Sequence, residues 1–290
     1  MPHTIYNGME YALPVTALSS VLLYEVQIIN ILTVAEDTNL MNISLTCRIS
    51  RAEGEDNHLY NVSLEKLIIN GREEGDYEQM EWLFAKVFSI NSELIIKTDQ
   101  HGAIKGIGDK TKILATWEIA KADINSIYEP ADVAGLINSI ETALHDDKKS
   151  LYYDDLLLNI LFNNIYQTYT GQEQLATAKT LLKHFGNTAL PIIEYKELIA
   201  IIDDPKTTVI EISGQVNADE LDFEGMNHYL AEITEQESDI EMDYYFDYQG
   251  TYYIKTGTEN YIDTAELTIT GSCEGYKKQA IYKLKLLSHE

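Results

Sequence analysis

The chain has 290 residues, 45% of them hydrophobic and 23% charged, a composition that is typical of a folded globular protein rather than a disordered one. Its 47 acidic and 21 basic residues give a formal net charge of -26. Proteins that bind a nucleic-acid backbone or an anionic membrane surface need clustered Lys and Arg, so we expect neither partner. The charge favours solubility, and it makes a basic protein a candidate partner.

The first residues include an apolar stretch, but no Lys or Arg precedes it and Pro14 interrupts it, so we expect no secretory signal. No apolar run reaches the roughly 18 residues that a membrane-spanning helix requires. Cys47 and Cys273 are two isolated cysteines, which fit a reduced cytoplasm better than an oxidising compartment, although a disulfide between them stays open. We therefore expect a cytoplasmic protein.

The first 70 residues predict β structure. In LMNISLTCRIS, apolar and polar residues alternate from Met41 to Ile49, which is typical of a strand with one buried face. The segments YEVQIINILTV and LYNVSLEKLIIN flank it with weaker alternation, and the polar turns AEDTN and RAEGEDN separate the three. They predict an antiparallel meander.

Helical patterns begin after this meander. Apolar residues at helical spacing predict a helix between Tyr77 and Phe88, and a hairpin that turns near Gly102 follows it. Asp109 is the predicted N-cap of the next helix, in which Ile113, Trp117, Ile124 and Ile127 share one face.

Three further helices are predicted. One lies in ADVAGLINSIETALH, and the very apolar SLYYDDLLLNILFNNIYQTY is expected to be the central, most buried helix. The third lies in TGQEQLATAKTLLKHFG, where Thr170 and Glu173 have capping-box spacing and Gly186 gives a stop.

The string DDPKTT around Pro205 predicts a boundary between region 1–204, a β-meander plus helices, and region 205–290, which is mainly β; a single continuous domain stays open. A strand in TVIEISGQV, a helix between Phe223 and Ile233, a hairpin that turns at Gly250, and strands in AELTITG and IYKLKLL complete the chain. The predicted fold class is α+β, with antiparallel β segments at both ends and a helical middle at 109–186.

The stretch DIEMDYYFDYQGTYYIKTG carries a row of acidic side chains. Alternation along a strand sends Asp239, Glu241, Asp243 and Asp247 to one side. Neighbouring carboxylates in such a row stand roughly 6.6–7 Å apart, too far for two of them to hold one ion without help from another segment, and the order of an EF-hand loop is missing. The same spacing occurs between the carboxylates of inverting glycosidases, but any acidic strand has it. The row predicts a solvated face.

Motifs for chemistry are missing. In GAIKGIGDKT five residues separate Gly102 from Gly108 and Asp109 precedes the lysine, which does not fit a phosphate-binding loop. The histidines and cysteines lack the spacing of metal sites, and no Gly-x-Ser-x-Gly elbow occurs. We expect no catalytic, cofactor-binding or metal-binding residues, although an active site assembled from distant segments stays open.

Tyrosine is unusually frequent, with 20 residues, many of them late in the chain. Strand propensity and core filling account for those on the apolar face. Tyr245 and Tyr253 are predicted on the polar side, where tyrosine is a favoured contact residue. Together with Asp243 and Asp247 they are the predicted protein-contact residues.

The order MEWLFAKVFSINSELIIKTDQHGAIKGI, ATWEIAKADI, LLLNILFNNIYQTY and IYKLKLL resembles a family of bacterial proteins that are encoded beside type VI (contractile) secretion and toxin components. The resemblance covers residues 75–287 at the level of pattern. It implies a cytoplasmic accessory role, such as loading or neutralising a toxin, and it carries no residue role with it.

We therefore expect a non-enzymatic protein-binding module, such as an adaptor, chaperone or immunity protein. The missing catalytic motifs, the acidic surface and the resemblance favour it. The alternative is a hydrolase that uses dispersed carboxylates, for example on a carbohydrate. A flat or grooved acidic and aromatic face would favour the first, and a deep pocket with two carboxyl groups across it would favour the second.

Overall fold

The computed structural model of the chain describes residues 2–3, 8–52, 58–145, 156–171, 173–186, 188–203, 205–235 and 243–290. Its helices are α1 (Gln79–Phe88), the short 3-10 helix η1 (Ser89–Asn91), α2 (Lys110–Ile127), α3 (Pro130–His145), α4 (Leu156–Leu161) and α5 (Phe223–Thr234). Its strands are β1 (Pro2–His3), β2 (Glu10–Ala12), β3 (Leu22–Val34), β4 (Asp37–Arg51), β5 (Leu59–Ile69), β6 (Glu93–Thr98), β7 (Ile104–Gly108), β8 (Thr168–Thr170), β9 (Gln174–Phe185), β10 (Thr188–Asp203), β11 (Lys206–Val216), β12 (Tyr245–Lys255), β13 (Tyr261–Cys273) and β14 (Tyr276–His289).

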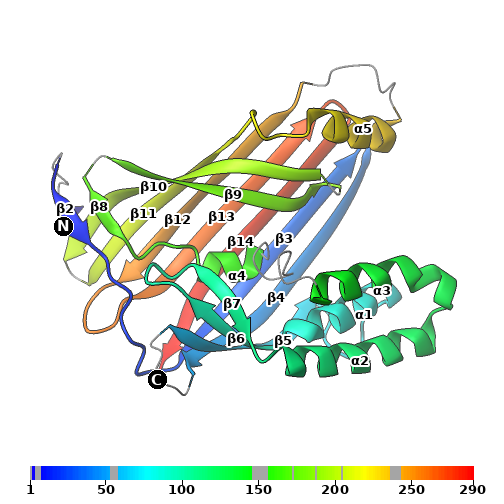
Figure 1. Ribbon diagram of the computed structural model, residues 1–290, viewed down its shortest axis with the longest axis horizontal. Helices are drawn as coiled ribbons and strands as arrows, with labels where there is room; N and C mark the ends of the chain where they lie inside the picture. The colour runs from blue at the N-terminus through cyan, green and yellow to red at the C-terminus, as the bar shows by residue number, and fades with distance from the viewer. Residues whose placement is uncertain are drawn as a thin grey trace. The chain divides into compact units, whose positions relative to one another are not determined.

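Most strands belong to one antiparallel sheet of 12 strands, in the order β1-β10-β11-β12-β13-β14-β3-β4-β5-β6-β7 (Figure 1). β9 joins this sheet by pairing with β10 beside β1, and β2 and β8 form a separate two-stranded sheet. The predicted meander of β3, β4 and β5 is confirmed as three neighbouring strands.

The predicted α+β class with a helical middle is wrong, because 52% of the chain is strand and 25% is helix. The segment predicted as the last helix of that middle forms β9, in which buried or half-buried side chains alternate with exposed ones from Leu175 to Leu182. Pairing with β10 supplies its backbone partners and overrides the helix propensity of Ala, Leu and Lys. The predicted cap is a turn, in which the Glu173 amide donates to the Thr170 carbonyl oxygen.

The segment predicted as the central helix is helical only from Leu156 to Leu161, and 151–155 lie outside the described residues. Asn164 has a φ of 52°, in the left-handed region where a right-handed helix cannot continue. Phe162 and Ile165 are nevertheless buried. The apolar composition therefore indicated burial correctly and helix length wrongly.

The other predicted helices are confirmed as α1, α2, α3 and α5. Asp109 is the N-cap of α2 as expected, but its side chain makes no capping hydrogen bond. Trp117 and Ile124 are buried on the expected face of α2, whereas Ile127, expected on the same face, is 53% exposed. Ile127 is the last residue of the helix, where the apolar face no longer packs against the core.

The chain divides into two compact units. Unit 1 comprises residues 1–16, 27–42 and 165–285, and unit 2 comprises residues 17–26, 43–164 and 286–290. The turn around Pro205, where the sequence predicts a domain boundary, lies within unit 1 and joins β10 to β11, with Asp203 paired to Lys206.

Unit 1 has its core on one face of strands β9 to β13. Ile192, Ile212 and Leu267 are almost fully buried on this face, and α5 packs against β9 and β10 with Met226 and Leu230 buried. Alternate side chains of each strand point to the opposite, solvated face, as antiparallel sheets allow.

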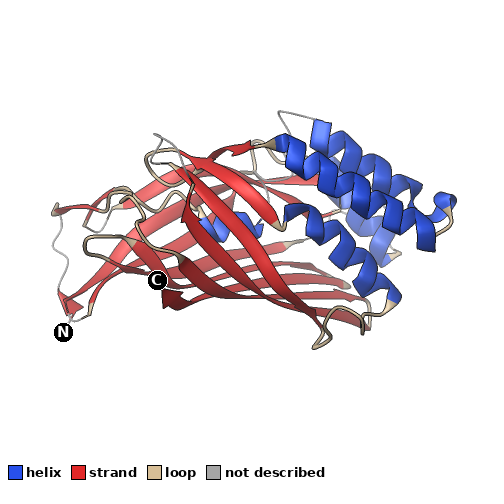
Figure 2. Cartoon of the chain, turned by 90° about the horizontal axis from the view of Figure 1, so that it is seen from below, coloured by secondary structure: helices blue, strands red, loops and turns tan. Residues whose placement is uncertain are grey.

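Unit 2 combines β4 to β7 with α1, α2 and α3, which lie beside one another (Figure 2). The start of α1 is fixed by Glu81, whose carboxylate accepts hydrogen bonds from the Glu78 amide at 3.0 Å and from Asn70 and Arg72 at 2.8 Å. A capping carboxylate held by several donors makes this helix terminus well defined.

Replacement of Phe162 by alanine tests the core of unit 2. The side chain is 7% exposed and its ring lies 5.7 Å from the Tyr60 ring, so we expect Phe162→Ala to lower the free energy of unfolding by about 3–5 kcal/mol. Denaturant titration measures this loss. The control Ile119→Ala removes a side chain that is 67% exposed on α2 and should change stability by less than about 0.5 kcal/mol. A loss below about 1 kcal/mol in Phe162→Ala would contradict the core assignment.

Candidate functional site

The four predicted contact residues lie on or next to β12 in unit 1. Asp243 is exposed just before the strand, Tyr245 and Tyr253 are 59% and 42% exposed, and Asp247 is half-buried. β12 is continuous, so its odd-numbered residues share one face and the two tyrosines stand roughly 26 Å apart on it. The structure places Tyr245, Asp247 and Tyr253 on one solvated side and leaves Asp243 exposed just ahead of them, at a separation that suits a broad contact better than one pocket.

The hairpin predicted at Gly250 is wrong. Gly250 lies in the middle of β12, opposite Ile212 of β11 and Leu267 of β13. A Cβ atom at this position would come within 2.7 Å of the Glu266 carbonyl oxygen, so the glycine permits a close approach of two strands and makes no turn.

The structure describes the acidic stretch from residue 243 onward and not its first residues. Asp239 and Glu241 lie outside the described residues. Lys255, at the end of β12, forms an ion pair with Asp263 of β13 at 3.4 Å. The actual turn lies between β12 and β13, where Lys255 pairs with Tyr261.

Polar residues of the neighbouring strands extend the solvated face between the two tyrosines. Thr251 stands between Glu211 of β11 and Glu266 of β13, both of which are exposed. Gln249 stands between Ser213 and Thr268 in the next row. We call this surface, defined by Tyr245, Asp247, Tyr253 and these neighbours, the β12 face. It is acidic, polar and aromatic.

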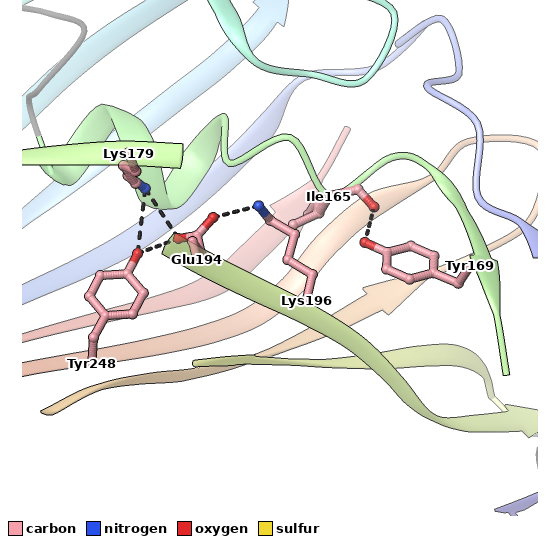
Figure 3. A network of polar contacts seen from close by, with 6 residues as sticks. All are labelled: Ile165, Tyr169, Lys179, Glu194, Lys196 and Tyr248. Atoms are coloured by element: carbon pink, nitrogen blue, oxygen red, sulfur yellow. Dashed lines mark hydrogen bonds and ion pairs between the residues drawn. The ribbon is translucent and has the colours of Figure 1, made fainter. Parts of the chain in front are cut away.

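A cluster of buried charges lies on the opposite face of the same strands (Figure 3). Glu194 and Lys196 occupy successive inward positions of β10, and each is 1% exposed. The Glu194 carboxylate accepts hydrogen bonds from Lys196, from Lys179 of β9 at 3.3 Å, and from the Tyr248 hydroxyl of β12. One carboxylate therefore connects three strands.

Gly214 of β11 makes the contact between Tyr248 and Glu194 possible. Register places Glu194, Gly214 and Tyr248 in one row across β10, β11 and β12. A Cβ atom on Gly214 would lie 2.9 Å from the Tyr248 ring, so the ring lies over the glycine and reaches the second strand away. A side chain at position 214 would occupy that space.

The cluster keeps its charges when buried. Burial raises the pKa of Glu194, but the charges of Lys179 and Lys196 and the hydrogen bonds outweigh it and lower the pKa to about 2. Burial lowers the pKa of Lys196, and Glu194 partly offsets this. Burial likewise raises the pKa of Tyr248, which therefore stays a hydrogen-bond donor. A carboxylate enclosed by internal donors is a structural ion pair rather than a base that is open to a substrate.

The sequence contains a weak signal for this cluster. In PIIEYKELI, charged residues interrupt an apolar run at strand spacing, with Glu194 and Lys196 two residues apart. Both residues were missed because this segment was not predicted as a strand. The partners Lys179 and Tyr248 come from strands that were predicted as a helix and as one arm of a hairpin, so no pattern in the sequence brings them together.

Removal of one ammonium group from the cluster should destabilise the folded protein. Lys196→Met leaves the buried Glu194 carboxylate with Lys179 and Tyr248 alone, and we expect it to lower the free energy of unfolding by about 3 kcal/mol. The double variant Glu194→Gln/Lys196→Met removes both charges and should lose less than Lys196→Met does. Urea denaturation at pH 7 measures both. Equal losses in the two variants would contradict the ion-pair assignment.

His184 of β9 is a second buried titratable group in unit 1. Its ring lies 5.0 Å from the Phe185 ring and 5.9 Å from the Phe246 ring, and within the described part of the chain its Nε2 has no hydrogen-bond partner. Burial and, to a lesser degree, the charge of Lys278 lower its pKa to about 3. The folded state therefore holds this imidazole neutral.

The pH dependence of stability follows from this shift. The unfolded chain binds a proton at His184 below about pH 6.5 and the folded chain does not until about pH 3, so stability is lost as the pH falls through this window. We expect about 2 kcal/mol less stability at pH 5 than at pH 7 from this residue, measured by denaturant titration. His184→Leu should remove that difference, and His289→Leu, which changes an exposed histidine, should keep it. The same pH dependence in wild type and His184→Leu would refute the assignment.

Two pockets can be located among the residues of unit 2 that the structure describes. One of about 590 Å³ lies between β5 and α1 and is lined by Leu64–Ile68, Glu73, Glu74, Tyr77, Trp82, Ala85, Lys86, Phe88, Ser89 and Ser92. The other, of about 260 Å³, lies at β6 and β7 and includes Glu93, Asp109 and Lys112. Among the described residues no group of three or more His, Cys, Asp or Glu side chains is placed to hold a metal ion. Cys47 and Cys273 are not joined by a disulfide in the described structure.

Comparison with known proteins gives little. No protein-family model and no curated protein matches the chain, and neither search links it to type VI secretion components. A solved structure described as "lipid-protein interactions in lipovitellin" aligns with a TM-score of 0.44 and 8% identity, over 94% of this chain and 25% of that chain. This chain thus spans about a quarter of the length of that protein. None of the helices in the described ranges has the length and apolarity to cross a bilayer.

Proposed function

We propose that the protein is a non-enzymatic protein-binding module, of the kind that serves as an adaptor, chaperone or immunity protein. The observation that supports this role best is the β12 face, on which Tyr245 and Tyr253 are 59% and 42% exposed around an acidic and polar centre. Tyrosine supplies a large contact area at a small cost in side-chain entropy, and it is enriched where proteins bind other proteins.

The net charge of -26 supports a basic partner. Such a field speeds the encounter with a positive surface, and screening at about 0.15 M ionic strength confines it to roughly 8 Å. Charge therefore governs the association rate, while the tyrosines provide the short-range contacts that govern dissociation.

The alternative, a hydrolase with dispersed carboxylates, stays a prediction. It requires two carboxyl groups that face each other across a pocket. The smaller pocket of unit 2 contains Glu93 and Asp109, but Lys112 forms an ion pair with Glu93, and that contact is typical of a structural charge pair. We therefore favour the binding role.

Site-specific photo-crosslinking tests the binding role. Benzoylphenylalanine placed at Tyr245 or Tyr253 should give a discrete adduct with one protein in cells of the source organism. The same group at Ile119, which is 67% exposed in unit 2, is the control and should not give that adduct. No adduct from either β12 position, or identical adducts from all three positions, would contradict the proposal.

The kinetics of the crosslinked partner test the physical basis. Once that partner is purified, surface plasmon resonance should show an association rate that falls as salt increases, and Tyr245→Ala or Tyr253→Ala should raise mainly the dissociation rate. An association rate that does not change with salt would contradict the proposed role of charge in the encounter. An unchanged dissociation rate in both variants would contradict the proposed role of the two tyrosines in short-range contact.

A further inference from the structure

The larger pocket of unit 2 lies where β5 loses one of its neighbouring strands. β5 pairs with β4 as far as Ile69, but with β6 only as far as Ser63. From Leu64 to Ile68, the side of β5 that β6 would occupy faces α1, and no strand of the described chain pairs there. We call the pocket between Leu64–Ile68 and α1 the β5–α1 groove.

Aromatic side chains form the walls of the β5–α1 groove, and internal contacts hold them in place. The Tyr77 hydroxyl donates to the Leu67 carbonyl oxygen at 2.6 Å. The Trp82 ring lies 6.3 Å from the Tyr128 ring and 5.3 Å from the Lys86 ammonium. Walls that are already ordered lose little further entropy when a ligand arrives.

The charge of the groove is negative at its rim. Glu73 and Glu74 are exposed and line the groove next to Tyr77. Burial raises the pKa of Tyr77, and the charges of Glu74 and Glu73 raise it further, which agrees with carboxylates close to the phenol. Two lysines also line the groove, of which Lys86 is paired with Asp123 at 2.7 Å and Lys66 is exposed on β5. The third carboxylate of the lining, Glu65, is paired with Arg48 at 3.4 Å. An incoming cation therefore meets two carboxylates at the rim.

This combination selects the chemistry of the ligand. Lysine and arginine carry a cation on an apolar stem, which matches acidic groups at a rim and aromatic walls below it. A volume of about 590 Å³ lies in the range of about 300–1,000 Å³ that small-molecule sites have, so it accommodates a short segment and not a folded domain. The edge of β5 has room for a short extended segment alone, because the Leu64 amide already donates to the Ser92 carbonyl oxygen at 2.7 Å and the Leu67 carbonyl oxygen accepts from Tyr77. Lys66, with a φ of 50°, further limits the length of this edge.

We propose that the β5–α1 groove binds a short, extended, lysine- or arginine-bearing segment of another protein. The inference rests on the proposed protein-binding function and adds the chemistry of a partner segment. It uses residues of unit 2 alone, whereas the β12 face belongs to unit 1. The two ideas can therefore fail separately.

Fluorine NMR of protein labelled with 5-fluorotryptophan tests the groove directly. The chain has 2 tryptophans, of which Trp82 lines the groove and Trp117 is 1% exposed in the core. The probe is the acetylated, amidated peptide Arg-Leu-Arg-Leu, and the matched control is Glu-Leu-Glu-Leu. The basic peptide should shift the Trp82 resonance saturably and leave that of Trp117 in place, and the acidic peptide should shift neither.

Two double variants separate the groove from the general charge of the protein. Glu73→Gln/Glu74→Gln should lower the affinity for the basic peptide by about fivefold, because each exposed carboxylate contributes a modest attraction. Glu118→Gln/Glu129→Gln makes the same change of net charge at exposed positions of the same unit and should leave the affinity unchanged. Near-ultraviolet circular dichroism checks that both variants keep the wild-type fold.

The contrary outcomes are specific. An unmoved Trp82 resonance, an equal shift with the acidic peptide, or equal weakening in the two double variants would each overturn the groove proposal. Crosslinks from the β12 face together with an unmoved Trp82 resonance would reject the groove alone. Peptide binding at Trp82 without crosslinks from Tyr245 or Tyr253 would support the groove and reject the β12 face.

Discussion

Glu194 carries a full negative charge on the buried face of β10, and much of unit 1 is arranged to neutralise it. Two ammonium groups and one phenol reach the same carboxylate from β9, β10 and β12. An uncompensated buried charge costs several kcal/mol, whereas a fully paired one costs little, so the cluster tolerates only one alignment of these strands. The charges thus exclude a slip by two residues, which would keep every apolar side chain on its own face of the sheet.

The two surfaces proposed for binding use different physics. The β12 face is a broad area of sheet, and its two tyrosines are proposed to contact a partner at points roughly 26 Å apart along one strand. The β5–α1 groove is a small concave site that accepts single side chains. A broad face gives affinity through area and exclusion of water, and a groove gives selectivity for the residue that enters it. A protein that has both can recognise a partner by its shape and by its sequence.

Local patterns in the sequence predicted some elements well because local physics forms them. The stripe that contains Trp117 and Ile124 marks α2, and alternation from Met41 to Ile49 marks β4. Local patterns could not predict β9, because its Ala, Leu and Lys residues favour a helix and only pairing with β10 makes it a strand. Gly250 shows the same limit, because a glycine for a turn and a glycine for a close strand contact look identical in a sequence.

The candidate sites divide in the same way. Exposure of Tyr245 and Tyr253 follows from strand alternation, so it could be predicted even though the hairpin around them was wrong. The charge cluster could not be predicted, because its members are separated by up to 69 residues and meet only through the order of the strands. The β5–α1 groove depends on where β6 stops pairing with β5, and no sequence pattern at that point predicts the end of the pairing.

The space above Gly214 also links two positions in evolution. The Tyr248 ring occupies the volume that a side chain at position 214 would need, so the two residues share one site on the sheet. A lineage can enlarge position 214 only after position 248 has become small, and the reverse order passes through a poorly packed intermediate. Once Tyr248 is smaller, Glu194 loses a donor, which in turn favours loss of its charge. Related sequences should therefore change these three positions as a set, with glycine at 214 wherever an aromatic residue stands at 248.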